Sequence, residues 1–484
     1  SIPDTNSTAK LGSATPTSIA KSGNTYTLGL NIVGTPDGAE VLKVSPAANS
    51  IYDALDNISS TTQSNNTANL KDKAPATITA VNVSNDNTSV AVTISEAVYS
   101  TNNGSGDLEK GDFTFTMSGG AASLSSATPT TISKSGNIYT LGFGLSGTPS
   151  GAEIINVSPV ANSIYDALGN ISLTSQSNNT ANLKDKAKPI ISNLELANNN
   201  GTIAVTFSES VFSNNNGSGD LDSLDFVLSM SGSGASLSQA NPTTISKNGN
   251  IYTLGIGLNG TPTGAETLIV KPALNAIYDS SGNTADTTQA GNSKTLNDKY
   301  APTITAVAPS SDNTSIVVSF SETVFKASNG NGDLEVSDFK LSMSGGRAIL
   351  KSATPTSISK SGNNYTLGID VSGTGTGKEV IAAIPIASSI YDNAGNVALS
   401  TQASNTTYLK DLSGPIIVSM SPENQNNNLV VTFDEPAFTS SNGTGILDTS
   451  DVTLTLSGGT ATLSTSKPDT ITQSGNTYTF DLDL

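Results

Sequence analysis

The chain has 484 residues, with 40 Asp and Glu against 22 Lys and Arg, which gives a net charge of −18. Such a surface repels nucleic acid and anionic membranes, because binding either one requires a basic patch. The chain has no cysteine, no histidine and no long apolar run, so it lacks disulfides, the usual general base and a membrane span.

A repeat of 113 residues runs through the chain. Two sets of residues keep this spacing, the tyrosines of the motif IYD and a series of glutamates: Tyr52, Tyr165, Tyr278 and Tyr391, and Glu96, Glu209, Glu322 and Glu435. A period of this length is that of a whole domain rather than of a solenoid turn. Linkers that contain proline end the last strand of each repeat. They predict a partial repeat at 1–74, whole repeats at 75–187, 188–300 and 301–413, and a partial repeat at 414–484.

Within each repeat, apolar residues alternate with polar ones, which is the pattern of half-buried strands. In residues 188–300 the pattern predicts strands, in chain order, at 202–207, 226–231, 251–258, 266–272 and 293–298. About seven short strands in roughly 110 residues, with no helical segment, are typical of an Ig-like sandwich. The sequence therefore predicts an all-β chain of tandem antiparallel Ig-like β-sandwiches joined by short linkers.

An acidic loop follows the second predicted strand of each repeat. In the third repeat it is "SNNNGSGDLDSLDF" (213–226), whose oxygen-bearing residues nearly match the spacing of an EF-hand calcium loop. Position 1 lacks a carboxylate, position 12 is Asp rather than Glu, and no helices flank the loop, so we expect a looser calcium site. The loop ligands this predicts are Asn103, Asp107, Glu109, Asp112, Asn216, Asp220, Asp222, Asp225, Asp333, Glu335 and Asp338. Ile446 replaces the first of these aspartates in the last repeat, where we expect a weaker site or none.

Further carboxylates are predicted to converge at one end of each repeat, because alternate loops of a sandwich lie at alternate ends. In the third repeat Glu209 follows the second strand, Asp279 belongs to the IYD loop, and Asp185 lies in the preceding linker. Their mutual repulsion is costly unless a cation offsets it, and hard oxygen ligands favour Ca²⁺. The ligands this predicts are Glu96, Asp166, Asp185, Glu209, Asp279, Asp298, Glu322 and Asp392, and the linkers also carry Asp72 and Asp411.

Each of these residues also has an interpretation without a metal. Asp279 could make an Asx turn before Gly282, Glu209 could pair with a lysine, and Asp225 could simply open its strand. The IYD tyrosines are expected to be core or corner residues rather than platforms on which sugars stack. A catalytic role for paired carboxylates is disfavoured, because the same loop recurs in every repeat.

These motifs together resemble a known group of proteins. The motif "VTFSE" (205–209), the acidic loop, "IYD-x-x-GN" and the Asp-Lys-Ala-Pro linker resemble the bacterial Ig-like tandem repeats of giant cell-surface proteins. The chain is similar to repeats of cyanobacterial swimming-associated surface proteins and, more distantly, to S-layer Ig-like domains. The resemblance covers the whole chain and implies an extracellular, non-enzymatic, often calcium-stabilised rod, stalk, filament or coat. The alternative is an adhesin module that binds carbohydrate or another surface ligand.

The partial repeats at the two ends are expected to expose incomplete cores with open strand edges, which are prone to pairing. One explanation is that flanking repeats of a longer chain complete them. The other is that copies of the chain complete each other head to tail by strand complementation, building a filament.

Overall fold

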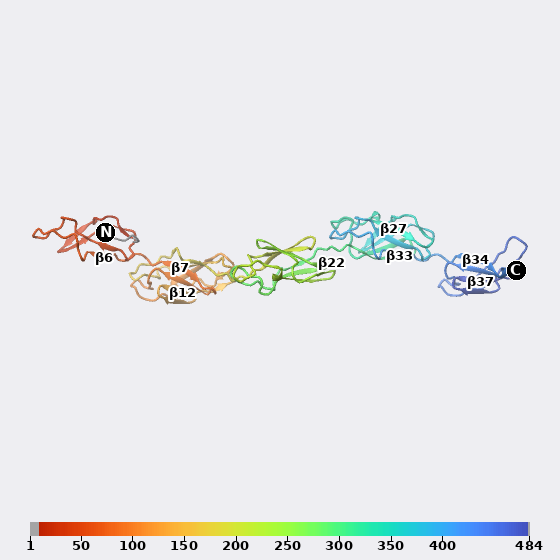
Figure 1. The fold of residues 1–484 in the computed structure, drawn as a ribbon, viewed down its shortest axis with the longest axis horizontal. Coiled ribbons are helices and arrows are strands. Elements are labelled where there is room, and N and C mark those ends of the chain that lie inside the picture. The colour runs from red at the N-terminus through yellow and green to blue at the C-terminus, as the bar shows by residue number, and fades with distance from the viewer. Residues whose placement is uncertain (1–8, 483–484) are drawn as a thin grey trace. The chain divides into compact units, whose positions relative to one another are not determined.

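The computed structural model describes residues 9–482, which form strands and short turns of 3₁₀ helix (Figure 1). These residues include no helix that is long and apolar enough to cross a membrane. The chain forms two compact units. The first holds the residues up to 230 together with 237–258 and 267–294, and the second holds 231–236, 259–266 and the residues from 295 onward. This division does not follow the five repeats, whose boundaries stay a prediction.

The strands recur in the same order along the chain. Residues 9–74 contain β1 (Lys10–Leu11), β2 (Ile19–Ser22), β3 (Thr25–Leu28), β4 (Ile32–Val33), β5 (Val41–Lys43) and β6 (Thr67–Asn69). Residues 75–187 contain β7 (Ile78–Val83), β8 (Ser89–Ile94), η1 (Lys110–Asp112), β9 (Phe113–Ser118), β10 (Ser123–Leu124), β11 (Ile132–Ser135), β12 (Ile138–Gly142), β13 (Leu145–Ser146), β14 (Ile154–Pro159) and β15 (Thr180–Asn182). Residues 188–300 contain β16 (Ile191–Leu196), β17 (Thr202–Phe207), η2 (Ser223–Asp225), β18 (Phe226–Ser231), β19 (Ala235–Leu237), β20 (Ile245–Asn248), β21 (Ile251–Gly255), β22 (Leu258–Gly260), β23 (Thr267–Pro272) and β24 (Ser293–Thr295).

The remaining strands continue this order. Residues 301–413 contain β25 (Ile304–Pro309), β26 (Ser315–Phe320), η3 (Val336–Asp338), β27 (Phe339–Ser344), β28 (Ile349–Leu350), β29 (Ile358–Ser361), β30 (Asn364–Gly368), β31 (Val371–Ser372), β32 (Val380–Pro385) and β33 (Thr406–Tyr408). The last segment contains β34 (Ile417–Glu423), η4 (Asn424–Asn426), β35 (Asn428–Phe433), β36 (Ile471–Ser474) and β37 (Thr477–Asp481).

Residues 75–187 fold into two facing antiparallel sheets. One sheet has the order β11-β12-β8-β7 and the other has the order β15-β14-β9, with β10 and β13 forming a separate pair. Residues 301–413 repeat this arrangement as β29-β30-β26-β25, β33-β32-β27 and β28-β31. The predicted all-β tandem sandwich fold is therefore confirmed. Each of these segments has nine strands rather than about seven, and a turn of 3₁₀ helix precedes the third strand where the acidic loop caps it.

The alternating apolar residues fill the space between the sheets. Tyr139 of β12 lies opposite Val92 of β8, and both are at most 1% exposed. Ile155 and Val157 of β14 belong to the same core from the other sheet and are fully buried. Burial of each aliphatic side chain contributes about 1.5–3 kcal/mol, so this shared core holds the two sheets together.

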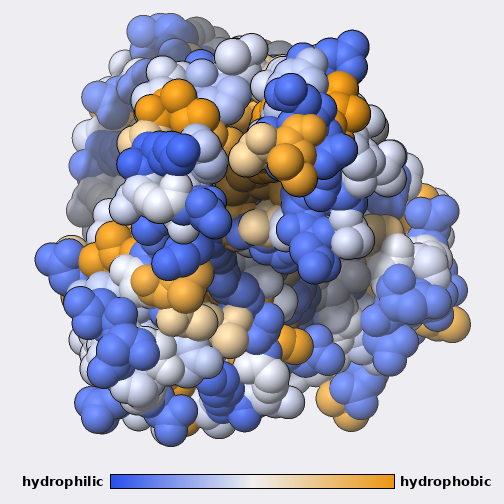
Figure 2. Space-filling model, turned by 90° about the vertical axis from the view of Figure 1, so that its left-hand side faces the viewer, coloured by the Kyte–Doolittle hydropathy of each residue, from blue (hydrophilic) through white to orange (hydrophobic). Residues whose placement is uncertain are grey.

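The segment 9–74 lacks part of such a core. It contains counterparts of β10–β15, whereas β7–β9 have none among its described residues. As a result Tyr26 is 53% exposed and Val44 is 44% exposed, although their counterparts Tyr139 and Val157 are buried. Figure 2 shows hydrophobic residues around a hollow on the side where this segment lies.

Candidate metal centres

Within residues 9–482, three groups of carboxylates repeat along the chain, and each brings together three segments. In every group, one carboxylate oxygen of each residue lies within 4.8 Å of the others. The groups are Asp72, Glu96 and Asp166; Asp185, Glu209 and Asp279; and Asp298, Glu322 and Asp392. Each takes one residue from a linker, one from just after the second strand (β8, β17 or β26) and one from the IYD loop. The structure thus brings together the linker and loop carboxylates that the sequence predicted to converge.

Hydrogen bonds on the preceding repeat fix the linker aspartate. Asn87 has a left-handed backbone, with φ of 57°, in the turn between β7 and β8. Its side chain accepts from Lys184 N at 2.8 Å and donates to Lys184 O at 2.7 Å, directly before Asp185. A Cβ atom at Gly151, whose φ is +77°, would lie 3.2 Å from Asp185 Cβ, so only glycine allows this close approach without strain. These contacts hold Asp185 at the end of its repeat.

The aspartate of the IYD loop is buried and tied to its own loop. Asp279 Oδ1 accepts from the main-chain nitrogens of Ser281 and Asn283, each at 2.8 Å. Asn283 Nδ2 donates to Asp279 Oδ2 at 2.7 Å and to Asp185 O at 3.3 Å, so it links the loop to the linker. Asp279 therefore makes an Asx turn and also belongs to the carboxylate group, because a carboxylate has about four sites for accepting bonds.

The glutamate of each group has no cationic partner. In the described part of the chain, Glu96, Glu209 and Glu322 form no ion pair with a lysine or arginine. Burial raises the pKa of Glu209 to about 7, and the charges of Asp279 and Asp185 raise it further in the same direction. Burial and the neighbouring aspartates likewise raise the pKa of Glu96 and of Glu322 to about 7. Among the described residues, therefore, no ion pair offsets the negative charge of these three glutamates.

The donor set of these groups fits a hard divalent cation. It consists of carboxylate oxygens, and the chain has no cysteine or histidine that would attract a softer metal. Ca²⁺ takes six to eight oxygen ligands from carboxylates, carbonyls and water, whereas Mg²⁺ demands a stricter octahedron. Three carboxylates can supply part of such a shell, each through one or both oxygens.

This charge pattern predicts a dependence of stability on pH in the presence of a chelator. Between the ordinary glutamate pKa of 4.5 and about 7, the folded state keeps protons on these glutamates that the unfolded state releases. Stability should therefore fall as pH rises through this window, so that the melting temperature is higher near about pH 5.5 than near about pH 7.5. Saturating calcium should reduce or reverse this difference, because it favours the ionised groups. Calorimetry at the two pH values checks this, and a melting temperature that rises with pH in chelator would contradict it.

The carboxylates of the acidic loops lie outside these groups and have other contacts. Asp225 Oδ2 accepts from Asp222 N at 2.7 Å, and Asp222 Oδ1 accepts from Leu224 N at 2.7 Å, which caps η2. Glu109 N and Glu335 N likewise donate to Asp112 Oδ2 and Asp338 Oδ2, each at 2.7 Å. The side-chain oxygen of Asn216 accepts from Ser218 Oγ, and that of Asn103 from Thr101 and Ser105, all at 2.5 Å. Asp225 therefore lies directly before β18 and hydrogen-bonds within its own loop, which agrees with the interpretation that it opens this strand without a metal.

The first aspartate of the loop pairs with a lysine. Asp220 lies 3.4 Å from Lys247 Nζ, and this nitrogen lies 5.7 Å from the ring centre of the buried Tyr252. Asp333 and Lys360 repeat this pairing at 3.9 Å. At the corresponding positions of the last repeat, Ile446 and Gln473 replace both charges together. Asp220 and Asp333 therefore have partners of their own, which favours the three carboxylate groups over the loops as calcium sites. Calcium binding by the loops, Asp107 included, stays a prediction.

Sequence reasoning missed a series of fully buried glutamates beside the metal groups. Glu153 Oε1 accepts from Ala121 N at 2.8 Å and Ala122 N at 3.0 Å, while Oε2 accepts from Ser150 N at 2.9 Å. Burial acts to raise the pKa of Glu153, but the main-chain donors outweigh it and lower the pKa. The series keeps the 113-residue spacing, and in the strand predicted at 266–272 its member falls on the inward face with Leu268 and Val270, so two features could have revealed it: Glu40, Glu153, Glu266 and Glu379.

The IYD tyrosines occupy corners. The hydroxyl of Tyr278 donates to Asn275 O at 2.8 Å, three residues upstream, and the ring is half-buried. Tyr278 also bridges to Phe212, at the start of the acidic loop. Tyr165 and Tyr391 make the corresponding contacts. This arrangement favours the corner interpretation over a sugar-stacking platform.

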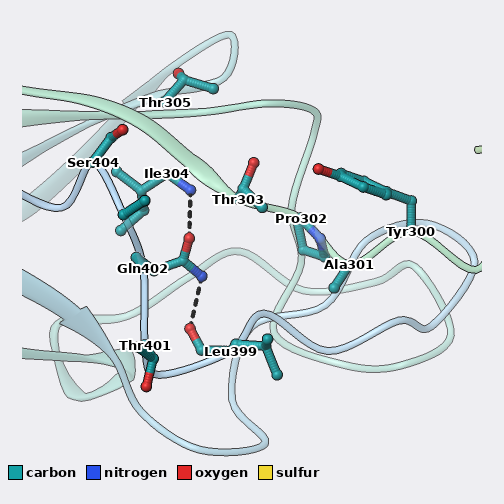
Figure 3. Close-up of a pocket in the computed structure, with 11 residues that line it drawn as sticks. Tyr300, Ala301, Pro302, Thr303, Ile304, Thr305, Leu399, Thr401, Gln402 and Ser404 are labelled. Atoms are coloured by element: carbon teal, nitrogen blue, oxygen red, sulfur yellow. Dashed lines mark hydrogen bonds between the residues drawn. The ribbon is translucent and has the colours of Figure 1, made fainter. Parts of the chain in front are cut away.

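A pocket of about 470 Å³ lies between the start of β25 and the segment 399–404. Figure 3 shows Gln402 inside it, with its side-chain oxygen accepting from Ile304 N at 3.0 Å and its nitrogen donating to Leu399 O at 2.7 Å. Gln176 and Gln289 accept from Ile78 N and Ile191 N in the same way. Both polar groups of the Gln402 side chain are hydrogen-bonded to the main chain, so we interpret this pocket as a feature of the fold rather than a ligand site.

The fold and these groups define the chain as a tandem β-sandwich protein with carboxylate clusters beside its linkers. No family model matches the sequence, and no curated protein matches it either. Among solved structures, the chain is similar to FdeC, an adhesin of Escherichia coli, at 13% identity. The match covers 68% of this chain and 96% of that chain, with a TM-score of 0.27. The resemblance to particular bacterial repeat families stays an expectation.

Proposed function

We propose that this protein is a structural component of a cell surface, in which tandem sandwiches form a rod, stalk or coat stiffened by calcium. The observation that carries the proposal is the position of Asp72, Asp185 and Asp298. Each belongs to a linker, yet its carboxylate lies with two carboxylates of the following repeat. A cation bound there ties the linker to that repeat, whereas its removal leaves three repelling charges at the joint.

Small-angle scattering of the full chain tests this proposal. With calcium we expect a narrow distribution of long dimensions, and with a chelator a broader one with a smaller mean, because the linkers can then bend. Asp185→Asn should broaden the distribution in calcium, while Asp222→Asn, in the acidic loop, should leave it unchanged. A distribution that does not respond to chelation would restrict any bound ion to the interior of a repeat.

The alternative function is an adhesin module that binds carbohydrate or another surface ligand. It requires an exposed array of aromatic or threonine side chains, and the half-buried IYD tyrosines use their hydroxyls within the fold. A glycan-binding assay on the full chain separates the two functions, since the structural role predicts no specific glycan binding.

We further propose that the exposed inner faces near the two ends of the structure are covered in the assembled protein. Ile417 is 54% exposed although its counterpart Ile304 is 3% exposed, as is also seen for Tyr26 and Tyr139. Either flanking repeats of a longer chain or another copy of the same chain could supply the covering strands. Light scattering of residues 1–484 at rising concentration distinguishes them. Self-complementation predicts head-to-tail polymers, whereas a folded monomer at high concentration excludes them.

A further inference from the structure

The linker between residues 301–413 and 414–484 is bordered by charges of opposite sign. The guanidinium of Arg347 forms an ion pair with the carboxylate of Asp434. Lys378 Nζ donates to Asp434 O at 3.3 Å. Arg347 and Lys378 precede the linker that carries Asp411, while Asp434 follows it. This contact therefore joins the two sides of the linker directly.

The counterparts of these residues in the earlier repeats are uncharged. One period earlier the three positions hold Gly234, Ala265 and Ser321, and two periods earlier they hold Ala121, Ala152 and Ser208. All three charges therefore occur together at this linker, and the equivalent positions of the two preceding linkers carry none of them.

The surrounding main chain is the same despite these changes. Arg347 N donates to Glu379 Oε1 at 2.7 Å, as Ala121 N donates to Glu153. Asp434 Oδ1 accepts from Ile416 N at 2.9 Å, which is the role that Ser208 Oγ has toward Ile190 N at 3.1 Å. The hydrogen bonds at the Arg347 and Asp434 positions are therefore the same as at Ala121 and Ser208, and the two sites differ in charge.

We infer that Arg347, Lys378 and Asp434 form a cation-independent lock on this linker, so that it stays fixed when calcium is removed. The expectation that the other linkers loosen when calcium is removed rests on the proposed function, whereas the lock rests on the ion pair between Arg347 and Asp434. An exposed ion pair shifts an equilibrium by up to about fivefold. We expect a larger effect from this pair than from a fully exposed one, because the Asp434 side chain is only 14% exposed. Lys378 also donates to the main-chain oxygen of Asp434.

Distances measured between spin labels in the full chain test the inference, since the chain has no cysteine of its own. Ser135→Cys with Asn248→Cys spans the linker near residue 187, and Ser361→Cys with Ser474→Cys spans the locked linker at equivalent, exposed positions. Chelation should broaden the first distance distribution and leave the second unchanged. Arg347→Ala should broaden the second with or without calcium, while Lys351→Ala, which removes the ion pair with Asp370, should not.

A transplant provides the converse experiment. Ala121→Arg, Ala152→Lys and Ser208→Asp together place the same three charges beside the linker near residue 187, and chelation should then no longer broaden the first distribution. A second distribution that Arg347→Ala leaves unchanged would overturn the lock, as would one that broadens on chelation in the wild type. If chelation broadens neither distribution, the calcium part of the proposed function fails, while the effect of Arg347→Ala still decides the lock.

Discussion

Replacing Glu96, Glu209 and Glu322 together by glutamine should stabilise the protein in chelator and abolish its stabilisation by calcium. Glutamine has nearly the same shape but removes the half-buried charge that repels the two aspartates of each group. The same charge is needed to hold the ion. A site occupied at one hundred times its dissociation constant adds about 2.7 kcal/mol to the free energy of unfolding. Denaturant unfolding with and without calcium measures both effects.

The matched control changes the acidic loops. Asp107→Asn, Asp220→Asn and Asp333→Asn remove the same number of carboxylates from positions that lie outside the three groups. We expect the calcium response of this variant to be unchanged, with a loss of at most about 1 kcal/mol per ion pair. A lost calcium response in the loop variant, together with a retained one in the glutamine variant, would place the ion in the loops instead.

The substitution Glu153→Ala should produce the largest loss of stability of any single change considered for residues 75–187. It leaves the main-chain nitrogens of Ala121, Ala122 and Ser150 without their acceptor. A buried donor without a partner costs about 1–3 kcal/mol, so we expect a loss of roughly 3–5 kcal/mol in the free energy of unfolding.

Two variants calibrate this result in the same unfolding experiment. Glu153→Gln keeps one acceptor oxygen but turns an amide toward a donor, so it should be intermediate. Glu195→Ala removes an exposed glutamate and should change stability by less than about 0.5 kcal/mol. A loss below about 1 kcal/mol for Glu153→Ala would mean that water replaces the carboxylate.

The sequence predicted the sandwich and the convergence of carboxylates because both depend on regular features. The alternation in 202–207 predicts a strand with Ile203, Val205 and Phe207 inside, and all three are at most 2% exposed. The meeting of Asp185, Glu209 and Asp279 follows from the alternation of loops between the two ends of a sandwich, which requires no knowledge of side-chain packing.

Other features depend on contacts that no local pattern reveals. Asp220 has its lysine partner 27 residues away, on the hairpin of β20 and β21. The sequence of the loop therefore suggested a calcium site and gave no sign of this lysine. The alternation places Glu153 on the same face as the buried Ile155 and Val157, but its hydrogen-bond donors Ala121 and Ala122 lie in a loop 31 and 32 residues earlier. Arg347 and Asp434 are 87 residues apart, and only their pairing in the structure shows that they meet across a linker.

Equilibrium dialysis of the full chain against calcium tests the central claim most directly. With three carboxylate groups in the described residues, we expect three ions per chain that are lost together when Glu96, Glu209 and Glu322 become glutamine. The variant with asparagine at Asp107, Asp220 and Asp333 should bind the same number of ions as the wild type. A wild-type chain that binds no calcium, or a glutamine variant that binds as many ions as the wild type, would contradict the account.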